Sequence, residues 1–185
     1  MDRQHNSKLS LFLMELIVAI MFFSLSAAVC VRLFTSAHLL AEKTEGLSNA
    51  VIWSQNLSEA FAGSRGNFEA ISALYPNAYV VTETNEQQGK EGALIMFFDK
   101  DWEPLGSNPQ GAVYEAYIHI HEEDAAKVYS DVTDYGVTPE GKALVGNILI
   151  LNVDGVSEDY SQVIYDENRL ILSNCVDVYT GKEAN

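Results

Sequence analysis

An uninterrupted apolar run near the N-terminus constrains the fold of this 185-residue chain more than any other feature. Between Leu9 and Val31 the only charged residue is Glu15. As a helix, residues 11–31 would be about 31 Å long, which matches a hydrocarbon core of about 30 Å. The run is also longer than the roughly 7–15 apolar residues of an ordinary secretory signal. The sequence therefore predicts a transmembrane helix over residues 11–31.

Charged residues are distributed unevenly around this run. Arg3 and Lys8 precede it, so the positive-inside rule places residues 1–10 in the cytoplasm and the C-terminal domain outside the cell membrane. Residues 35–185 hold 24 of the 26 acidic and 8 of the 11 basic side chains, a net charge of −16. Because such a surface repels phosphate backbones, no nucleic-acid partner is expected.

The helical pattern continues beyond the apolar run as an amphipathic stripe. We expect one helix from about Leu9 to Phe61, with residues 32–62 as its amphipathic half, because no proline interrupts it and Gly63–Gly66 can end it. The stripe predicts burial against the rest of the domain for three residues in particular, which are Leu40, Leu47 and Val51.

Residues 63–185 read as a small α+β domain that the helix completes. Asn67 can cap a short helix that ends near Leu74. Runs rich in β-branched and aromatic residues then predict strands. The expected strands are 78–84, 93–98, 112–121 and 143–153, followed by a closing hairpin of 162–165 with 169–173. The predicted fold class is thus α+β, with a long N-terminal helix packed on an antiparallel sheet.

Glu15 is the sharpest chemical signal in the chain. A carboxylate near the centre of a membrane span costs about 2.5–3.5 kcal/mol on insertion scales, and less near an end. Glu15 could be a tolerated residue close to the interface. It could instead await a cationic partner from another chain, because each member of such a pair would be stranded alone in a medium of low dielectric constant.

The segment Ser10-Leu-Phe-Leu-Met-Glu-Leu16, followed by Ile17-Val-Ala-Ile-Met21, resembles the N-terminus of type IV prepilins and pseudopilins. That family has a short basic leader, a cleavage point, an apolar first mature residue and a glutamate at the fifth mature position. With Leu11 as the first mature residue, Glu15 is the fifth and Ser10 ends the leader. The likeness covers about the first 60 residues in motif and the remainder in architecture.

The resemblance implies processing and assembly. A prepilin peptidase would cut between Ser10 and Leu11 and methylate the new amine, which would pair with Glu15 of a neighbouring subunit. The chain departs from the family at two positions. Ser10 stands where the family strongly prefers glycine, and Arg32 stands where major pilins usually have a proline. The second departure indicates a minor, pseudopilin-like or diverged subunit.

Two other clusters contain possible metal ligands. Asp99 and Asp101 alternate as in calcium loops, but Pro104 follows where a glycine is needed, which favours a solvated turn. His119 and His121 share a strand face and precede three acidic residues, so a zinc or copper site is conceivable. Exposed strand histidines without a ligand are commoner. We therefore expect no metal and no cofactor.

The function that these observations favour is that of a structural subunit of a type IV pilus-like or type II secretion-like pseudopilus. Its expected partners are other pilin-like subunits, prepilin peptidase and membrane lipid, in a machine for secretion, DNA uptake or adhesion. The alternative is a single-pass membrane-anchored acidic binding module that does not assemble. The sequence has no nucleophile elbow and no phosphate loop, so enzymatic activity is not expected.

Overall fold

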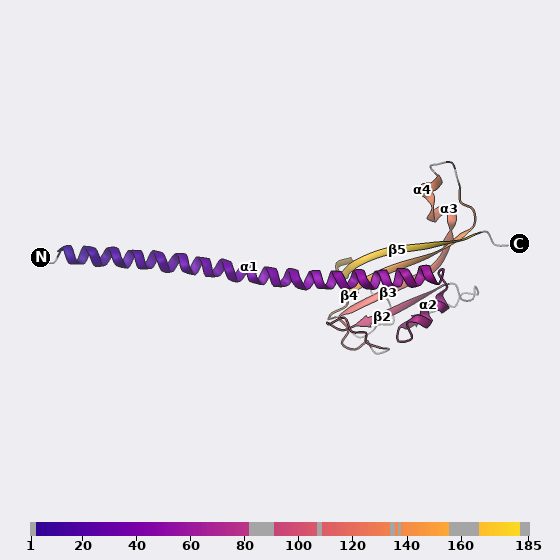
Figure 1. The fold of residues 1–185 in the computed structure, drawn as a ribbon, viewed down its shortest axis with the longest axis horizontal. Helices are drawn as coiled ribbons and strands as arrows, with labels where there is room; N and C mark the ends of the chain where they lie inside the picture. Colours follow the sequence, from indigo (N-terminus) through magenta and orange to yellow (C-terminus); the bar gives the residue numbers. More distant parts are fainter. Residues whose placement is uncertain are drawn as a thin grey trace. The chain divides into compact units, whose positions relative to one another are not determined.

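The computed structural model describes residues 3–81, 91–106, 109–133, 136, 138–155 and 167–181 (Figure 1). The chain divides into two compact units, Met1–Glu45 and Gly46–Asn185. Helix α1 (Arg3–Gly63) contributes to both units. The predicted α+β class is confirmed, because the C-terminal turns of α1 pack on a five-stranded antiparallel sheet.

Helix α1 is 61 residues long and ends where the sequence predicts. The N–H of Gly66 donates to the carbonyl of Phe61 at 2.8 Å, and the N–H of Arg65 donates to that of Ala62 at 3.1 Å. These two bonds form a Schellman motif, which satisfies the last carbonyls of a helix. Arg65 and Gly66 both have positive φ, 54° and 73°, so the chain leaves the helix direction at this point.

Helix α2 (Phe68–Leu74) is also formed as predicted. The Asn67 side chain accepts a hydrogen bond from the N–H of Ala70 at 3.0 Å, which satisfies one of the free donors of the first turn. Pro76 lies just beyond the C-terminus of α2. Because proline disfavours a helical conformation in the residue before it, the helix does not continue through Tyr75. Phe68 and Ile71 are buried, so this short helix adds one apolar face to the core.

The sheet is an antiparallel meander in the order β1-β2-β3-β4-β5. Between β3 and β4 lie two single-turn helices, α3 (Ala125–Val128) and α4 (Ser130–Thr133). The strands are β1 (Tyr79–Val81), β2 (Gly92–Phe98), β3 (Tyr114–Asp124), β4 (Lys142–Asn152) and β5 (Leu170–Gly181).

The C-terminal strand differs from its prediction. β5 continues for 12 residues to Gly181, instead of stopping near residue 173, and it pairs with β4. A short 3-10 helix, Glu167–Arg169, precedes it, and the expected partner segment 162–165 lies outside the described residues. The alternation after Asn174 explains the extension, because Val176 and Val178 pack on the core.

The burial predicted for three residues of the apolar stripe of α1 is wrong, because Leu40, Leu47 and Val51 are 66%, 48% and 39% exposed. Phe61 of the same predicted stripe is fully buried, and so is Leu57. The core between α1, α2 and the sheet is built from the following buried residues: Ala50, Leu57, Phe61, Phe68, Ile71, Leu94, Met96, Phe98, Trp102, Ala116, Ile118, Ile120, Leu144, Ile148 and Ile150.

Small residues on α1 explain which of its faces meets the sheet. Gly46, Ala50 and Ser54 face the sheet, and the Tyr114 hydroxyl lies 3.9 Å from the point where a Cβ on Gly46 would stand. The Asn174 amide of β5 donates to Ser54 Oγ at 3.3 Å. A helix that presents small side chains lets bulky groups of the sheet approach its backbone. The larger leucine and valine side chains therefore lie on other faces of α1.

The opposite face of the sheet carries a second apolar cluster. Its buried members come from β2, from the segment before β3, from β4 and from the residue that follows β4, and they are Ile95, Phe97, Ala112, Leu151 and Val153. All seven residues of β2 are buried, as in a strand that is covered on both faces. The sheet is therefore a middle layer along β2 rather than a surface layer.

Candidate functional site

The predicted processing and assembly residues lie in the first compact unit. Ser10, Leu11 and Glu15 all belong to α1, and all three are exposed. Leu11 and Glu15 are one turn apart and so lie on one face, about 6 Å apart along the helix axis. No described side chain forms an ion pair with Glu15. The site is therefore a single carboxylate on an otherwise apolar helix surface.

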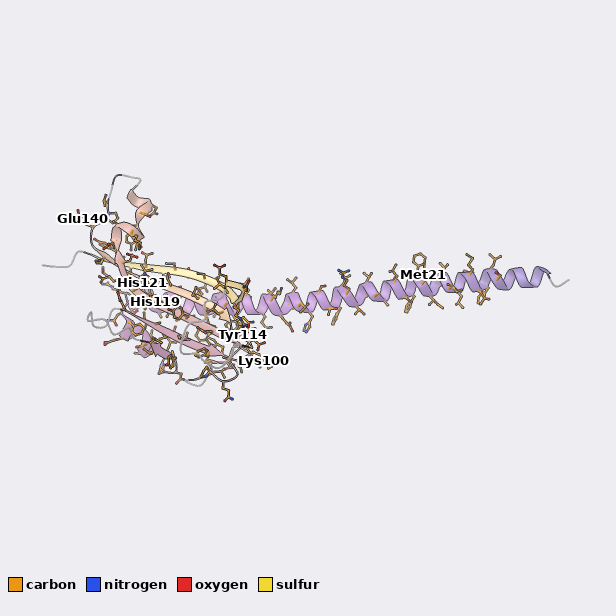
Figure 2. The ribbon with its side chains drawn as sticks, turned by 180° about the vertical axis from the view of Figure 1, so that it is seen from behind. Met21, Lys100, Tyr114, His119, His121 and Glu140 are labelled. Carbon is orange, nitrogen blue, oxygen red and sulfur yellow. The ribbon has the colours of Figure 1, made fainter. Side chains whose placement is uncertain are left out.

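The helix around Glu15 exposes its apolar side chains on every side. Each residue from Ser10 to Glu45 is exposed, and none in the most apolar 18-residue window is buried. Figure 2 shows these side chains, with Met21 labelled, projecting from the helix. Apolar surface of this extent does not remain in water. By length and composition, the helix can cross a membrane.

Two hydroxyl groups in this segment are satisfied within the helix. Ser24 Oγ donates to the carbonyl of Ile20 at 2.8 Å, and Thr35 Oγ1 donates to that of Val31 at 2.6 Å. Such bonds to the preceding turn let hydroxyl groups enter an apolar medium at low cost. A carboxylate has no hydrogen to donate to a carbonyl when it is ionised. Glu15 thus differs from these hydroxyls in requiring a donor from elsewhere.

His119 and His121 lie side by side on the outer face of β3 (Figure 2). Their ring centroids are 5.2 Å apart and their planes differ by 18°. Among the described residues, no group of three or more His, Cys, Asp or Glu side chains is placed to hold a metal ion.

The acidic turn after β2 uses its carboxylate for its own backbone. Asp99 Oδ1 accepts hydrogen bonds from the N–H groups of Asp101 at 2.9 Å and Glu103 at 3.0 Å. The Asp101 carboxylate lies 3.1 Å from Lys100 Nζ. Trp102 is buried in the core with a positive φ of 63° and so anchors the turn. The turn interpretation is favoured over a calcium loop, although its tryptophan is not solvated.

No protein-family model, curated protein or solved structure matches this chain. Its function is therefore inferred from the residues and geometry described above.

A buried carboxyl on β3 is a feature that the sequence analysis missed. Glu115 is only 4% exposed, and its Oε1 has no hydrogen-bond partner among the described residues. Strand pairing places Phe97 of β2 and Leu151 of β4 on its two sides. Burial raises the pKa of Glu115 from its ordinary value of 4.5 to about 7. The group is therefore half ionised near neutral pH.

The signal for this burial was present in the neighbouring strands. Within β3, Glu115 falls on the face with Tyr117 and His119, so alternation alone places it on the solvent side. The unbroken apolar sequence of β2 and the mostly apolar sequence of β4 instead indicate that both faces of the sheet are covered. The placement of Glu115 between β2 and β4 follows only from the observed strand register.

Glu115 is expected to make the protein less stable as the pH rises. Below pH 4.5 the carboxyl is protonated in both the folded and the unfolded chain. Between 4.5 and about 7 the unfolded chain loses this proton first, so the free energy of unfolding falls. Above the pKa of the folded state, the free energy of unfolding is lower than at acid pH by about 3 kcal/mol.

Denaturant unfolding of Glu115→Gln and of the parent at pH 4 and pH 8 measures this effect. The glutamine variant should gain stability relative to the parent at pH 8 and not at pH 4. Glu45→Gln, at an exposed position, is the matched control. If the difference in stability between Glu115→Gln and the parent were the same at both pH values, the raised pKa of Glu115 would be contradicted.

Proposed function

We propose that this protein is a structural subunit of a type IV pilus-like or type II secretion-like pseudopilus filament. One observation carries the proposal. A single continuous helix, α1, exposes apolar side chains around one carboxylate, Glu15, and then packs on an antiparallel sheet through Gly46–Gly63. A helix of this kind combines a span for lipid with a spine for a folded domain. The proposal assigns the protein no enzymatic reaction.

In this proposal the subunit begins as a membrane protein with residues 1–10 in the cytoplasm and its folded domain outside. Prepilin peptidase removes the leader between Ser10 and Leu11 and methylates the new amine. That amine then pairs with Glu15 of a neighbouring subunit. Both charges leave water during assembly, so each is stabilised only when the other is present.

Exposed apolar residues beyond the membrane span support contacts between subunits. Leu40 and Leu47 are large exposed side chains of α1, and Leu33 and Phe34 precede them with similar exposure. Surfaces of this kind are typically covered by a partner. In a filament, the helices of neighbouring subunits would cover them, which accounts for leucines that the core does not use.

Processing is tested by mass spectrometry of the protein isolated from membranes. The mature chain is expected to begin with methylated Leu11. Ser10→Gly introduces the residue that the family prefers before the cut, so it should be processed at least as completely as the parent. An intact residue 1–10 segment, in both proteins and in cells with an active prepilin peptidase, would rule out this step.

The alternative is a membrane-anchored acidic module that does not assemble. Ser10 favours it, because the family strongly prefers a glycine at this position. In that case α1 is a plain anchor, and Glu15 is a tolerated residue near the interface. The two functions differ in their need for Glu15, and the corresponding experiment is given in the Discussion.

A further inference from the structure

A surface pocket of about 200 Å³ lies at the β1 edge of the sheet, within the unit Gly46–Asn185. Met96 and Phe97 of β2 are buried and contribute its inner wall, together with Trp53 of α1. Pro76 and Pro104 are exposed and lie on its outer walls. Four separate segments of the chain therefore meet around one opening.

The walls of this pocket offer few hydrogen-bonding groups. The prolines have no N–H, and the N–H of Leu105 already donates to the carbonyl of Phe97 at 2.8 Å. The Tyr75 hydroxyl donates to the carbonyl of Asn56 at 3.4 Å. Asn77 contributes one amide side chain, and none of the described lining residues is charged. The pocket therefore suits an apolar group rather than a polar one.

The size of the pocket limits this group to one side chain. A cavity of about 150 Å³ lined by apolar residues accommodates benzene. At about 200 Å³, this pocket has room for one aromatic ring with its linking carbon atoms. Trp53 and Tyr75, which both line the pocket and pack against the core between α1 and the sheet, provide aromatic surface there. Aromatic rings pack favourably against each other in offset or tilted arrangements.

Acidic residues lie close to the segments that line the pocket. Glu103 directly precedes Pro104, and the charge of Glu59 raises the pKa of Tyr75, in addition to the effect of burial. Residues 46–185 contain 22 acidic and 7 basic side chains. The nearest basic residue along the chain, Lys100, is already paired with Asp101 at 3.1 Å. An incoming segment is therefore favoured if it carries positive charge next to its apolar group.

We propose that this pocket binds a basic peptide segment of a partner protein, by inserting one aromatic side chain that is flanked by lysine or arginine. The ring enters the apolar space lined by Trp53 and Tyr75, and the flanking cations interact with acidic residues near the lining segments, which include Glu59 and Glu103. All of these residues belong to the folded unit. The inference is thus independent of whether α1 assembles into a filament.

Three tripeptides of matched length test the two parts of this recognition. The probes are acetyl-Lys-Phe-Lys-amide, acetyl-Lys-Ala-Lys-amide and acetyl-Glu-Phe-Glu-amide, titrated against the full chain in nanodiscs of uncharged lipid. Fluorescence of Trp53 reports occupancy, because its side chain lines the pocket. The first peptide should bind at least about tenfold more tightly than either of the others, since each lacks one of the two favourable terms.

The substitution Gly106→Phe tests whether the peptide binds in the pocket or elsewhere on the surface. A Cβ on Gly106, which lines the pocket, meets no atom within 4 Å, and its φ lies outside the left-handed region, so the side chain can be added without strain. The variant should lose at least about tenfold in affinity for the first peptide. Gly63→Phe adds the same ring at another open position and should bind like the parent.

Equal binding of the phenylalanine and alanine peptides would reduce the interaction to surface charge and overturn the proposal. Unchanged affinity in Gly106→Phe would overturn it as well, as would the absence of saturable binding by the first peptide. A failure of filament assembly in the Glu15 experiment would leave these outcomes unaffected.

Discussion

Glu15→Gln is expected to insert into the membrane normally and to fail in joining neighbouring chains. The substitution preserves the size of the side chain and removes a charge from the span, so insertion should be as favourable as in the parent. In assembly, the amine of the neighbour would lose its counter-charge in a medium of low dielectric constant. Removing one partner of a well-buried pair costs about 3–5 kcal/mol. Such a loss reduces the association constant by more than a hundredfold.

Site-specific photocrosslinking between helices measures this loss. A crosslinking amino acid in place of Phe12, which is exposed on the same apolar segment, reports contact between neighbouring α1 helices. A blot of the membrane fraction controls for insertion. Ser24→Ala is the matched control, because the Ser24 hydroxyl donates only within its own helix, to Ile20. Equal crosslinking in Glu15→Gln and the parent would exclude the filament mechanism and favour the plain anchor.

The features that the sequence predicts well are those that depend on local chemistry. The end of α1 follows from the Gly63–Gly66 segment, and the start of α2 follows from the Asn67 cap. Strand β3 follows from an alternation that is visible without any partner. In each case, the deciding interactions join residues that are close in sequence. The class and order of the elements could therefore be predicted.

The face of α1 that meets the sheet could not be predicted in the same way. Where a helix carries apolar residues on several faces, periodicity does not identify the one that the core uses. A hydrophobicity criterion prefers Leu47 and Val51 over Gly46, Ala50 and Ser54, which are small. The sheet brings bulky groups such as Tyr114 close to the helix, so small residues are required there. That requirement depends on residues more than 60 positions away in the sequence.

The candidate sites also differ in whether they depend on local sequence or on contacts between distant segments. Ser10, Leu11 and Glu15 form a short local motif, so a sequence is sufficient to propose them. Glu115 acquires its character from the register of β3 with β2 and β4, and the pocket next to Trp53 forms where four segments meet. Neither feature has a contiguous sequence pattern. The long-range arrangement of the sheet was needed to find them.

The second large expected effect is a difference in stability between two variants of α1. One leucine lies on the face that meets the sheet, and the other lies on a different face of the same helix. Leu57 is fully buried in the core, whereas Leu47 is 48% exposed. Leu57→Ala removes buried methyl groups and leaves a cavity, so it should lower the free energy of unfolding by about 2–5 kcal/mol. Leu47→Ala should change it by less than about 1 kcal/mol, because leucine and alanine have similar helix propensities and the Leu47 side chain is half in solvent.

Urea unfolding of the full chain in detergent micelles, followed by the fluorescence of Trp53 and Trp102, measures both values. Both tryptophans contact the core that Leu57 helps to fill, so their emission reports the loss of this core. The two variants make the same chemical change ten positions apart on one helix. Differences in helix formation or detergent binding therefore largely cancel. If Leu47→Ala proved as costly as Leu57→Ala, the core would use the stripe that the sequence predicts, and α1 would pack on the sheet through its larger residues.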